Sequence, residues 1–294
     1  MLSYQHEYHA GNHGDILKHT CLAAILESLV KKDKPFTLID THSGAGRFSL
    51  DDERLMKTGE AESGIVKLEK ALENASEIPQ AIKLYAEIQK PYFKRKLYAG
   101  SPEIERLFLR DGDICHLIEK HPAALKSIEE NSKLPLITGN GEKNQSGKCM
   151  VHDGDSYKTL FSLVPPKIKR GLVLCDPSYE DKSDYLQVTD ALKNVRKKWN
   201  TAVIALWYPI LDRKKNETAQ MLCALEDFAK LGTNPCGTAR FELEIYRNDN
   251  LPPEMQGDAC PHMRGSGMFV INPPWLLEEK MNEALSFMQG IFCT

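Results

Sequence analysis

The stretch at residues 35–48, PFTLIDTHSGAGRF, decides the fold class of this 294-residue chain. Its apolar run at 36–39 has the length of a buried strand, and it leads directly into a turn that contains Gly44 and Gly46. Before it, residues 12–31 carry apolar side chains at helical spacing, which predicts a helix that ends before Pro35. A helix, a buried strand and a glycine turn in succession are typical of α/β proteins, in which a ligand can approach the turn closely.

Six further apolar runs of strand length follow, and most are separated by segments compatible with helices. They lie at residues 114–118, 149–152, 171–175, 201–207, 241–246 and 268–271. Strands that alternate with helices indicate a mostly parallel sheet covered on both faces. The last two runs have no helix pattern between them, so we expect them to form an antiparallel pair.

The stretch 52–98 differs in composition, because it is rich in Glu, Lys, Ala and Leu and has few β-branched runs. It contains two amphipathic helix patterns, the second opened by Pro79. We interpret 52–98 as an inserted helical subdomain, with 1–51 and 99–294 forming the main domain. Residues 140–149 and 250–262 look like loops.

The composition excludes several classes of protein. With 41% apolar residues and a formal charge of −3, the chain supports a packed core but carries no general basic coat. No window approaches 18 consecutive apolar residues, so we expect no membrane span, and the polar N-terminus predicts no secretory signal. The eight cysteines form no CxxC pair, which is typical of reduced thiols in a cytoplasmic protein and not of a disulfide framework or zinc site.

Acidic residues stand where the first four predicted strands end: Asp40, Glu119, Asp153 and Asp176. In an open α/β sheet, ligands bind at the carboxyl ends of the strands. Glu119 follows Gly46 by 73 residues, or by 26 once the insertion is removed, close to the spacing of a ribose-binding acid. Asp153 suits the exocyclic amine of an adenine. With no GxxxxGK loop in the sequence, this set indicates S-adenosylmethionine better than a pyrophosphate cofactor.

The segment GLVLCDPSY at 171–179 resembles the D/N-P-P-Y/F signature of amino-methyltransferases, which act on exocyclic amines of bases. The carboxylate of Asp176 and the backbone carbonyl of Pro177 can accept the two N–H bonds of such an amine, and Tyr179 can stack on the base. Ser178 replaces the usual second proline but leaves the Pro177 carbonyl in place.

The N-terminal 19 residues hold six aromatic or histidine side chains: Tyr4, His6, Tyr8, His9, His13 and His19. The histidine spacings do not form a regular i, i+4 set, so we favour contacts with substrate or cofactor over a metal site. A solvated tail is the remaining alternative.

Nearly the whole chain resembles one bacterial family, the enzymes that methylate N6 of an adenine in 23S ribosomal RNA. Members have also been labelled as proteins for the use of external DNA. The matching blocks occur in the family's order: YxHxxHAGNHxDxLKH from residue 4, DTHxGAGR at 40–47, SGI at 63–65, GSP at 100–102, ExHP at 119–122, DPxYE at 176–180, ALWYP at 205–209 and INPPW at 271–275.

This resemblance implies a Rossmann-like, class I S-adenosylmethionine-dependent methyltransferase with a seven-stranded, mostly parallel sheet and a small helical insert. It implies catalysis at Asp176 with Pro177 and Tyr179, and contact of the target base with Tyr4, His6 and Tyr179. The cofactor contacts that it implies, together with those argued above, are Lys18, His19, His42, Gly44, Ser101, Glu119, Asp153, Gly154 and Asp176.

The expected cofactor is S-adenosylmethionine, and the expected partner of a monomeric enzyme is 23S ribosomal RNA, protein-free or in an early assembly intermediate. Basic clusters at 94–96, 167–170, 196–198 and 213–215 offer contacts for an RNA backbone. One alternative is a metal-dependent nucleic-acid hydrolase that uses His42, His152, Asp153, Asp155 and Asp176. A second is a DNA-binding protein involved in the use of external DNA, although pure binding would not need the DPxY segment.

Overall fold

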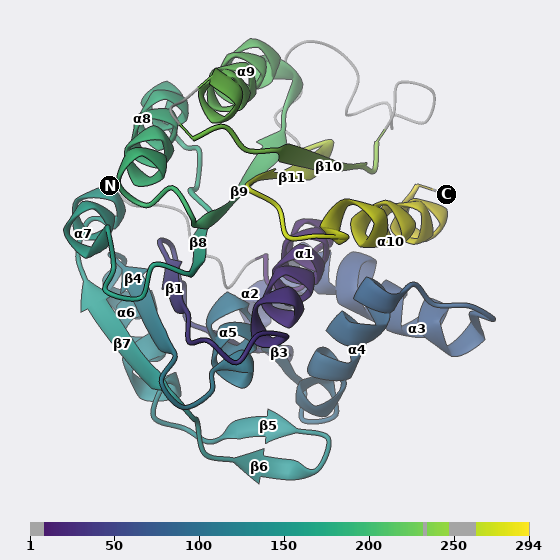
Figure 1. Ribbon diagram of the computed structural model, residues 1–294. Helices are drawn as coiled ribbons and strands as arrows, with labels where there is room; N and C mark the ends of the chain where they lie inside the picture. Colours follow the sequence, from purple (N-terminus) through teal and green to yellow (C-terminus); the bar gives the residue numbers. More distant parts are fainter. Residues whose placement is uncertain (1–8, 232–233, 247–262, 294) are drawn as a thin grey trace.

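The computed structural model of the chain describes residues 9–231, 234–246 and 263–293. At its centre lies a seven-stranded sheet in the order β10-β11-β9-β8-β1-β4-β7 (Figure 1). The strands are β1 (Thr37–Asp40), β4 (Ile114–Glu119), β7 (Lys148–Asp153), β8 (Gly171–Cys175), β9 (Val203–Ile210), β10 (Thr238–Glu244) and β11 (Gly265–Ile271). Strands β7, β4, β1, β8 and β9 pair in parallel, and β11 is antiparallel to both of its neighbours. The predicted Rossmann-like sheet and its antiparallel terminal pair are therefore confirmed.

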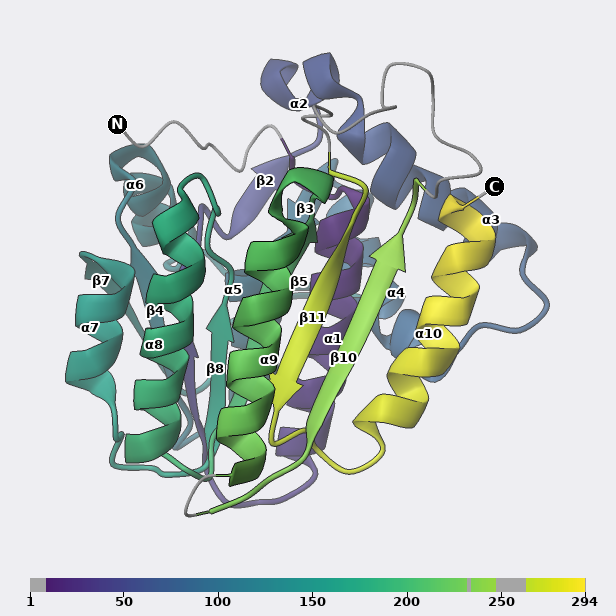
Figure 2. The ribbon, with the colours of Figure 1, turned by 90° about the horizontal axis from the view of Figure 1, so that it is seen from above.

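Helices cover both faces of the sheet (Figure 2). One face carries α7 (Ser156–Leu163), α8 (Lys182–Lys198) and α9 (Lys215–Leu231). The other carries α1 (His13–Val30), α5 (Ser101–Phe108), α6 (Pro122–Asn131) and α10 (Leu277–Phe292). Successive side chains of a strand point to opposite faces, so Leu38 packs into the α1 cluster and Ile39 into the α8 cluster.

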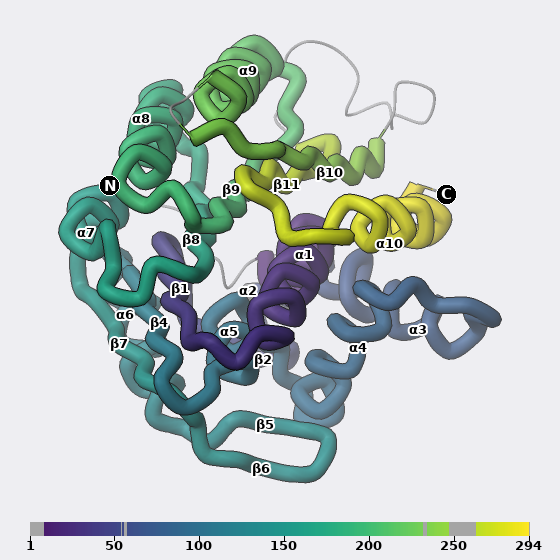
Figure 3. Tube along the Cα trace, viewed as in Figure 1, coloured from purple at the N-terminus to yellow at the C-terminus, as the bar shows by residue number. Residues whose placement is uncertain are grey.

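Helix α1 is buried on nearly all sides, since it lies between the sheet and the helices α4 (Gln80–Phe93) and α10 (Figure 3). Asn12 caps its start, because the Asn12 side chain accepts a hydrogen bond from the Asp15 amide at 2.9 Å. The burial extends to polar side chains: Asp15 is 2% exposed and Lys18 is 4% exposed. A buried charge needs partners, and those of Lys18 lie in the site described below.

The stretch 52–98 is mostly helical, with α2 (Glu53–Thr58), the π-helix η2 (Glu62–Val66), α3 (Lys67–Asn74) and α4. The short antiparallel pair β2 (Arg47–Ser49) and β3 (Leu97–Ala99) brackets it. Its apolar side chains, such as Ile65 and Tyr85, join the same core cluster as α1. The division of the chain into domains stays a prediction.

One smaller difference from the sequence analysis concerns a loop. Residues 141–143 are not loop but the strand β6 (Gly141–Lys143), which pairs with β5 (Leu136–Thr138). The predicted loop at 250–262 lies outside the described residues. A 3-10 turn, η3 (Asp212–Lys214), precedes α9. Of the helices in the described ranges, none is both long enough and apolar enough to cross a membrane.

Candidate active site

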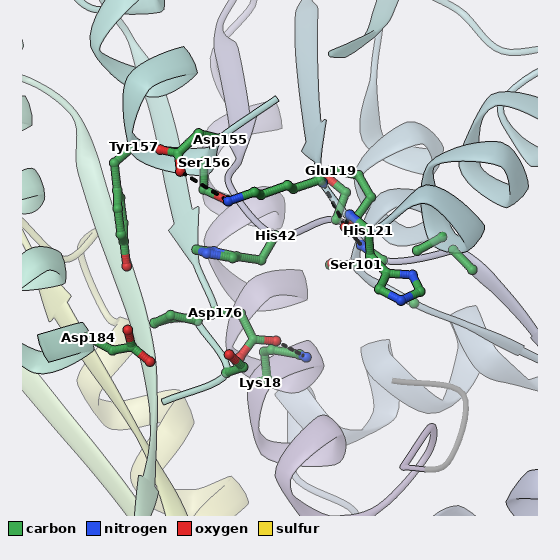
Figure 4. Close-up of a pocket in the computed structure, with 18 of the residues that line it drawn as sticks. Lys18, His42, Ser101, Glu119, His121, Asp155, Ser156, Tyr157, Asp176 and Asp184 are labelled. Atoms are coloured by element: carbon green, nitrogen blue, oxygen red, sulfur yellow. Dashed lines mark hydrogen bonds and ion pairs between the residues drawn. The ribbon is translucent and has the colours of Figure 1, made fainter. Parts of the chain in front are cut away.

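A cavity of about 240 Å³ opens at the carboxyl ends of the parallel strands (Figure 4). Glu119 and His121 stand on one side, Tyr157 and Asp184 on the other, and His42 lies between them. Of the side chains and glycines predicted from the sequence, eight line this cavity: Lys18, His19, His42, Gly44, Ser101, Glu119, Asp176 and Pro177. They come from the loops that follow β1 and β8, from the end of β4 and from the helices α1 and α5, so the fold brings together residues up to 159 positions apart.

Backbone amides hold the Glu119 carboxylate in place. Its Oε1 accepts hydrogen bonds from the amides of Lys120 at 2.8 Å and His121 at 2.6 Å, and its Oε2 accepts one from Gly44 at 2.7 Å. Gly44 has φ +61°, a backbone conformation that favours glycine. A carboxylate has about four lone-pair sites. One site therefore remains for a ribose hydroxyl, and a second hydroxyl would have to replace a backbone donor.

Asp40 is fully buried beneath the glycine turn and positions two predicted cofactor residues. It accepts hydrogen bonds from the Ser101 hydroxyl at 2.7 Å and from the His42 amide at 3.1 Å. Burial raises the pKa of Asp40 to about 6. The turn itself approaches Gly100 closely: the Gly100 amide donates to the Gly46 carbonyl at 2.8 Å, and a Cβ on Gly100 would lie 3.0 Å from that oxygen. This contact favours glycine at position 100, whereas Gly46 has φ +78° and a Cβ there would lie 2.6 Å from Ile128.

Lys18 and Asp176 form a part-buried ion pair in the wall of the cavity. The Lys18 Nζ lies 2.5 Å from Oδ2 of Asp176 and 2.8 Å from Oδ1 of Asp15. Burial lowers the pKa of Lys18, but the carboxylates of Asp15 and Asp176 raise it by more, so the net shift of the pKa is upward. Lys18 is therefore a permanent cation that fixes the Asp176 carboxylate, and the Oδ1 of Asp176 accepts no hydrogen bond from a described residue.

The two histidines of the site have different environments. Burial lowers the pKa of His42 to about 4, so this ring is neutral at pH 7, and its Nδ1 lies 2.8 Å from the Thr41 hydroxyl. The His42 ring stands edge-on to Tyr157, with centroids 5.9 Å apart. His19 is 1% exposed, and its Nδ1 is hydrogen-bonded to the Tyr98 hydroxyl at 2.7 Å. His19 therefore links the cavity to the insertion.

Asp153 and Gly154 stand at the end of β7 but do not line the cavity. Asp153 pairs in register with Glu119, and its side chain is exposed. The chain turns into the cavity only after Gly154, so Asp155, Ser156 and Tyr157 line the wall there. The contact of Asp153 and Gly154 with a cofactor adenine stays a prediction.

Tyr179 occupies a different place from the one that its stacking role requires. Its side chain is 5% exposed and does not line the cavity. Its hydroxyl donates to the Trp207 carbonyl at 3.0 Å, and its ring packs on Tyr185 at a centroid distance of 4.7 Å. With φ +53°, the backbone turns the ring inward. In this arrangement the ring cannot stack on a base in the cavity. The other two predicted substrate residues, Tyr4 and His6, lie outside the described residues.

The sequence analysis missed the wall formed by α7 and α8. Tyr157, Asp184 and Gln187 line the cavity opposite Glu119. Tyr157 could have been predicted from its place at the polar, aromatic start of the helix that follows β7. Asp184 and Gln187 lie one helical turn apart on α8, and the face of α8 that they occupy was not predictable before its core face was known.

Of the five residues of the hydrolase alternative, His42, Asp155 and Asp176 line the cavity, whereas His152 and Asp153 do not. His152 lies on β7 with its Nε2 2.9 Å from Nδ1 of His116, and it does not line the cavity. Within residues 9–231, 234–246 and 263–293, no three His, Cys, Asp or Glu side chains form a group that could hold a metal ion.

Comparison with known proteins agrees with this geometry. Residues 33–293 match the family model described as "Ribosomal RNA large subunit methyltransferase D, RlmJ". The chain is 37% identical to ribosomal RNA large subunit methyltransferase J of Escherichia coli, over 99% of this chain and 94% of that protein. It is also 37% identical to the protein of the same name from Haemophilus influenzae, over 98% and 93% of the two chains. The crystal structure of protein LPL1258 from Legionella pneumophila superposes with a TM-score of 0.77 at 30% identity, covering 97% of this chain and 94% of that one.

Proposed function

The chain belongs to the RlmJ family of ribosomal RNA large subunit methyltransferases, and from this premise we propose that it methylates N6 of an adenine in 23S ribosomal RNA. The observation that carries the proposal is the Asp176–Pro177 segment, which lines a cavity at the carboxyl end of β8 with its carboxylate fixed by Lys18. The family membership does not favour the hydrolase or DNA-binding alternatives.

S-adenosylmethionine is the cofactor, and the residues present fit it. Glu119 has acceptor capacity left for a ribose hydroxyl, and the neutral ring of His42 does not repel a sulfonium cation. Glu119, Ser101 and His42 are the side chains that would hold the cofactor. When bound, it supplies an electrophilic methyl group.

The residues of the chain position the amine that is methylated. Asp176 accepts one N–H bond of the exocyclic amine at its Oδ1, and the Pro177 carbonyl accepts the other. Lys18 holds the Asp176 carboxylate in one orientation, because its Nζ is ion-paired to Oδ2. Two acceptors in fixed positions direct the nitrogen lone pair, so positioning carries much of the rate. The proton released after transfer passes to Asp176 or to water.

The target nucleotide must leave its stack to reach this cavity. We keep Tyr4 and His6 as the proposed contacts of the target base. Stacking by Tyr179 requires its ring to leave Tyr185 and the Trp207 carbonyl, and Tyr157 is the aromatic ring already in the cavity wall. A monomer acting on protein-free 23S ribosomal RNA, or on an early assembly intermediate, completes the proposal.

The test is methyl transfer from labelled cofactor to protein-free ribosomal RNA, followed by nucleoside analysis. We expect label in N6-methyladenine with the wild-type protein. Asp176→Ala should lower turnover about a hundredfold or more, the scale of losing one preorganised group, while cofactor affinity changes far less. Label in cytosine, or full turnover by Asp176→Ala, would refute the mechanism.

A further inference from the structure

A second charged surface lies at the amino ends of the parallel strands, at the opposite end of the sheet from the cavity. The segments 31–34, 167–170 and 197–201 lead into β1, β8 and β9, which are parallel neighbours. The starts of parallel strands meet at one edge, which is the bottom of the view in Figure 2. We call these three segments the basic edge.

The basic edge concentrates positive charge in a chain whose formal charge is −3. Its segments contain eight lysines and arginines and one acid, Asp33. Seven of the cations are exposed lysines that form no ion pair with a described residue: Lys31, Lys32, Lys34, Lys167, Lys169, Lys197 and Lys198. Such a single-sign field attracts a polyanion.

Hydrogen bonds between the segments fix their backbones side by side. The Arg170 guanidinium donates to the carbonyl of Lys34 at 2.6 Å, and the Thr201 hydroxyl donates to the carbonyl of Lys169. The Arg170 carbonyl in turn accepts the amide of Thr37, the first residue of β1. The lysines therefore project from a rigid frame, so little backbone ordering opposes binding of a ligand.

An exposed tryptophan stands beside this edge. Trp275 is 87% exposed, in the loop that joins β11 to α10. Asn272 ties this loop to the basic edge, because its side-chain amide donates to the carbonyls of Thr201 and Ala202 at 3.2 Å each. Asn272 and Leu276 both have positive φ, 58° and 66°. A left-handed leucine is strained, and here the strained loop displays an indole ring to solvent.

We propose that the basic edge and Trp275 form a second RNA-binding surface, which holds a part of the ribosomal RNA remote from the target base. Exposed lysines contact phosphates, and an indole ring stacks on an unpaired base. Glu278 and Glu279 follow Trp275, so the loop itself adds no positive charge. It contributes base stacking, and the lysines contribute the positive charge. The proposal rests on the proposed function in one respect, that the RNA it binds is the substrate.

The distance between the cavity and the basic edge sets how long an RNA must be to contact both. β9 spans eight residues from one edge to the other, which is about 26 Å at the rise of a strand. That distance equals about eight base pairs of duplex at 3.4 Å each. An RNA that contacts both surfaces must therefore span this distance, as 23S ribosomal RNA can.

The experiment measures the affinity of the full chain for protein-free 23S ribosomal RNA by filter binding over a range of salt concentrations. One variant carries Lys→Gln at positions 32, 34, 169 and 198. The matched control carries Lys→Gln at the exposed positions 70, 83, 126 and 133 on α3, α4, α6 and the turn after α6. The basic-edge variant should bind at least tenfold more weakly at low salt, and its log–log salt slope should be shallower by about 3, at 0.7–0.9 per lost phosphate contact. The control should change affinity less than twofold.

Two further measurements complete the test. Trp275→Ala should weaken binding about tenfold, the scale of one lost base stack, and neither edge variant should change affinity for S-adenosylmethionine. Equal affinity of the basic-edge variant and wild type for the long RNA would overturn the proposal. So would lysine-dependent binding to phosphatidylglycerol vesicles without any effect on RNA. If wild type binds RNA as described but transfers no methyl group, the proposed function fails while this inference stands.

Discussion

Glu119→Gln should destabilise the protein even without cofactor. The amide oxygen of glutamine can keep the bonds from Lys120 and His121, but its NH₂ group then faces the Gly44 amide, a second donor. A hydrogen bond to a charged group contributes about 1.5–3 kcal/mol, and partial exposure of the site reduces this, so we expect a loss of about 2 kcal/mol. For a chain of 294 residues that lowers the melting temperature by about 3 °C.

The assay is thermal unfolding of the cofactor-free protein, and Asp153→Asn is the matched control. Asp153 stands opposite Glu119 on the neighbouring strand, is exposed, and accepts no hydrogen bond from a described residue, so its amide variant should melt with the wild type. Calorimetry should also show weaker S-adenosylmethionine binding by Glu119→Gln. Equal melting temperatures of Glu119→Gln and wild type would refute the account of the glycine turn.

Three further predictions concern other parts of the site. The pKa of His42 is about 4 in the folded protein and about 6.5 in the unfolded chain, so the unfolded state binds more protons and is favoured as the pH falls below 6.5. Between pH 7.5 and 5, chemical denaturation should show that the free energy of unfolding of wild type falls by about 2 kcal/mol relative to that of His42→Gln. The same pH dependence in both proteins would contradict this. Tyr179→Phe should cost about 1 kcal/mol of stability, for its bond to the Trp207 carbonyl, with turnover changed less than threefold; unchanged stability would argue against that bond. Gly64→Ala places a Cβ 2.1 Å from the Gly11 carbonyl oxygen and should destabilise by about 3 kcal/mol in urea titration, whereas Gly139→Ala, which meets nothing within 4 Å, should not; equal midpoints would count against the tight contact between η2 and the start of α1.

The sheet was predictable because strands that are buried on both faces have continuous apolar runs in the sequence. The run at 171–175 became β8 with the same bounds, and the others shifted by a few residues at their ends. The acids at the ends of β1, β4 and β8 followed from the same rule, since parallel strands bring their carboxyl ends together. Asp40 proved to be a buried support beneath the glycine turn, which its position at a strand end did not reveal.

Contacts between distant segments were not predictable in this way. Lys18 and Asp176 are 158 positions apart, and only the packing of α1 against the sheet brings them together. Tyr179 has a left-handed backbone, φ +53°, and its ring packs on Tyr185, and no pattern in the segment DPSY specifies either feature. Tyr157 lines the cavity because the chain turns inward after Gly154, a feature of one loop and not of a repeated pattern.

Nucleoside mass spectrometry of 23S ribosomal RNA is the decisive test of whether this chain methylates N6 of an adenine in that RNA. The RNA is isolated from a strain that lacks this gene and from the same strain carrying the wild-type or the Asp176→Ala gene. We predict that one N6-methyladenine position disappears on deletion, returns with wild type, and stays absent with Asp176→Ala. The same N6-methyladenine content in all three RNAs would contradict the account.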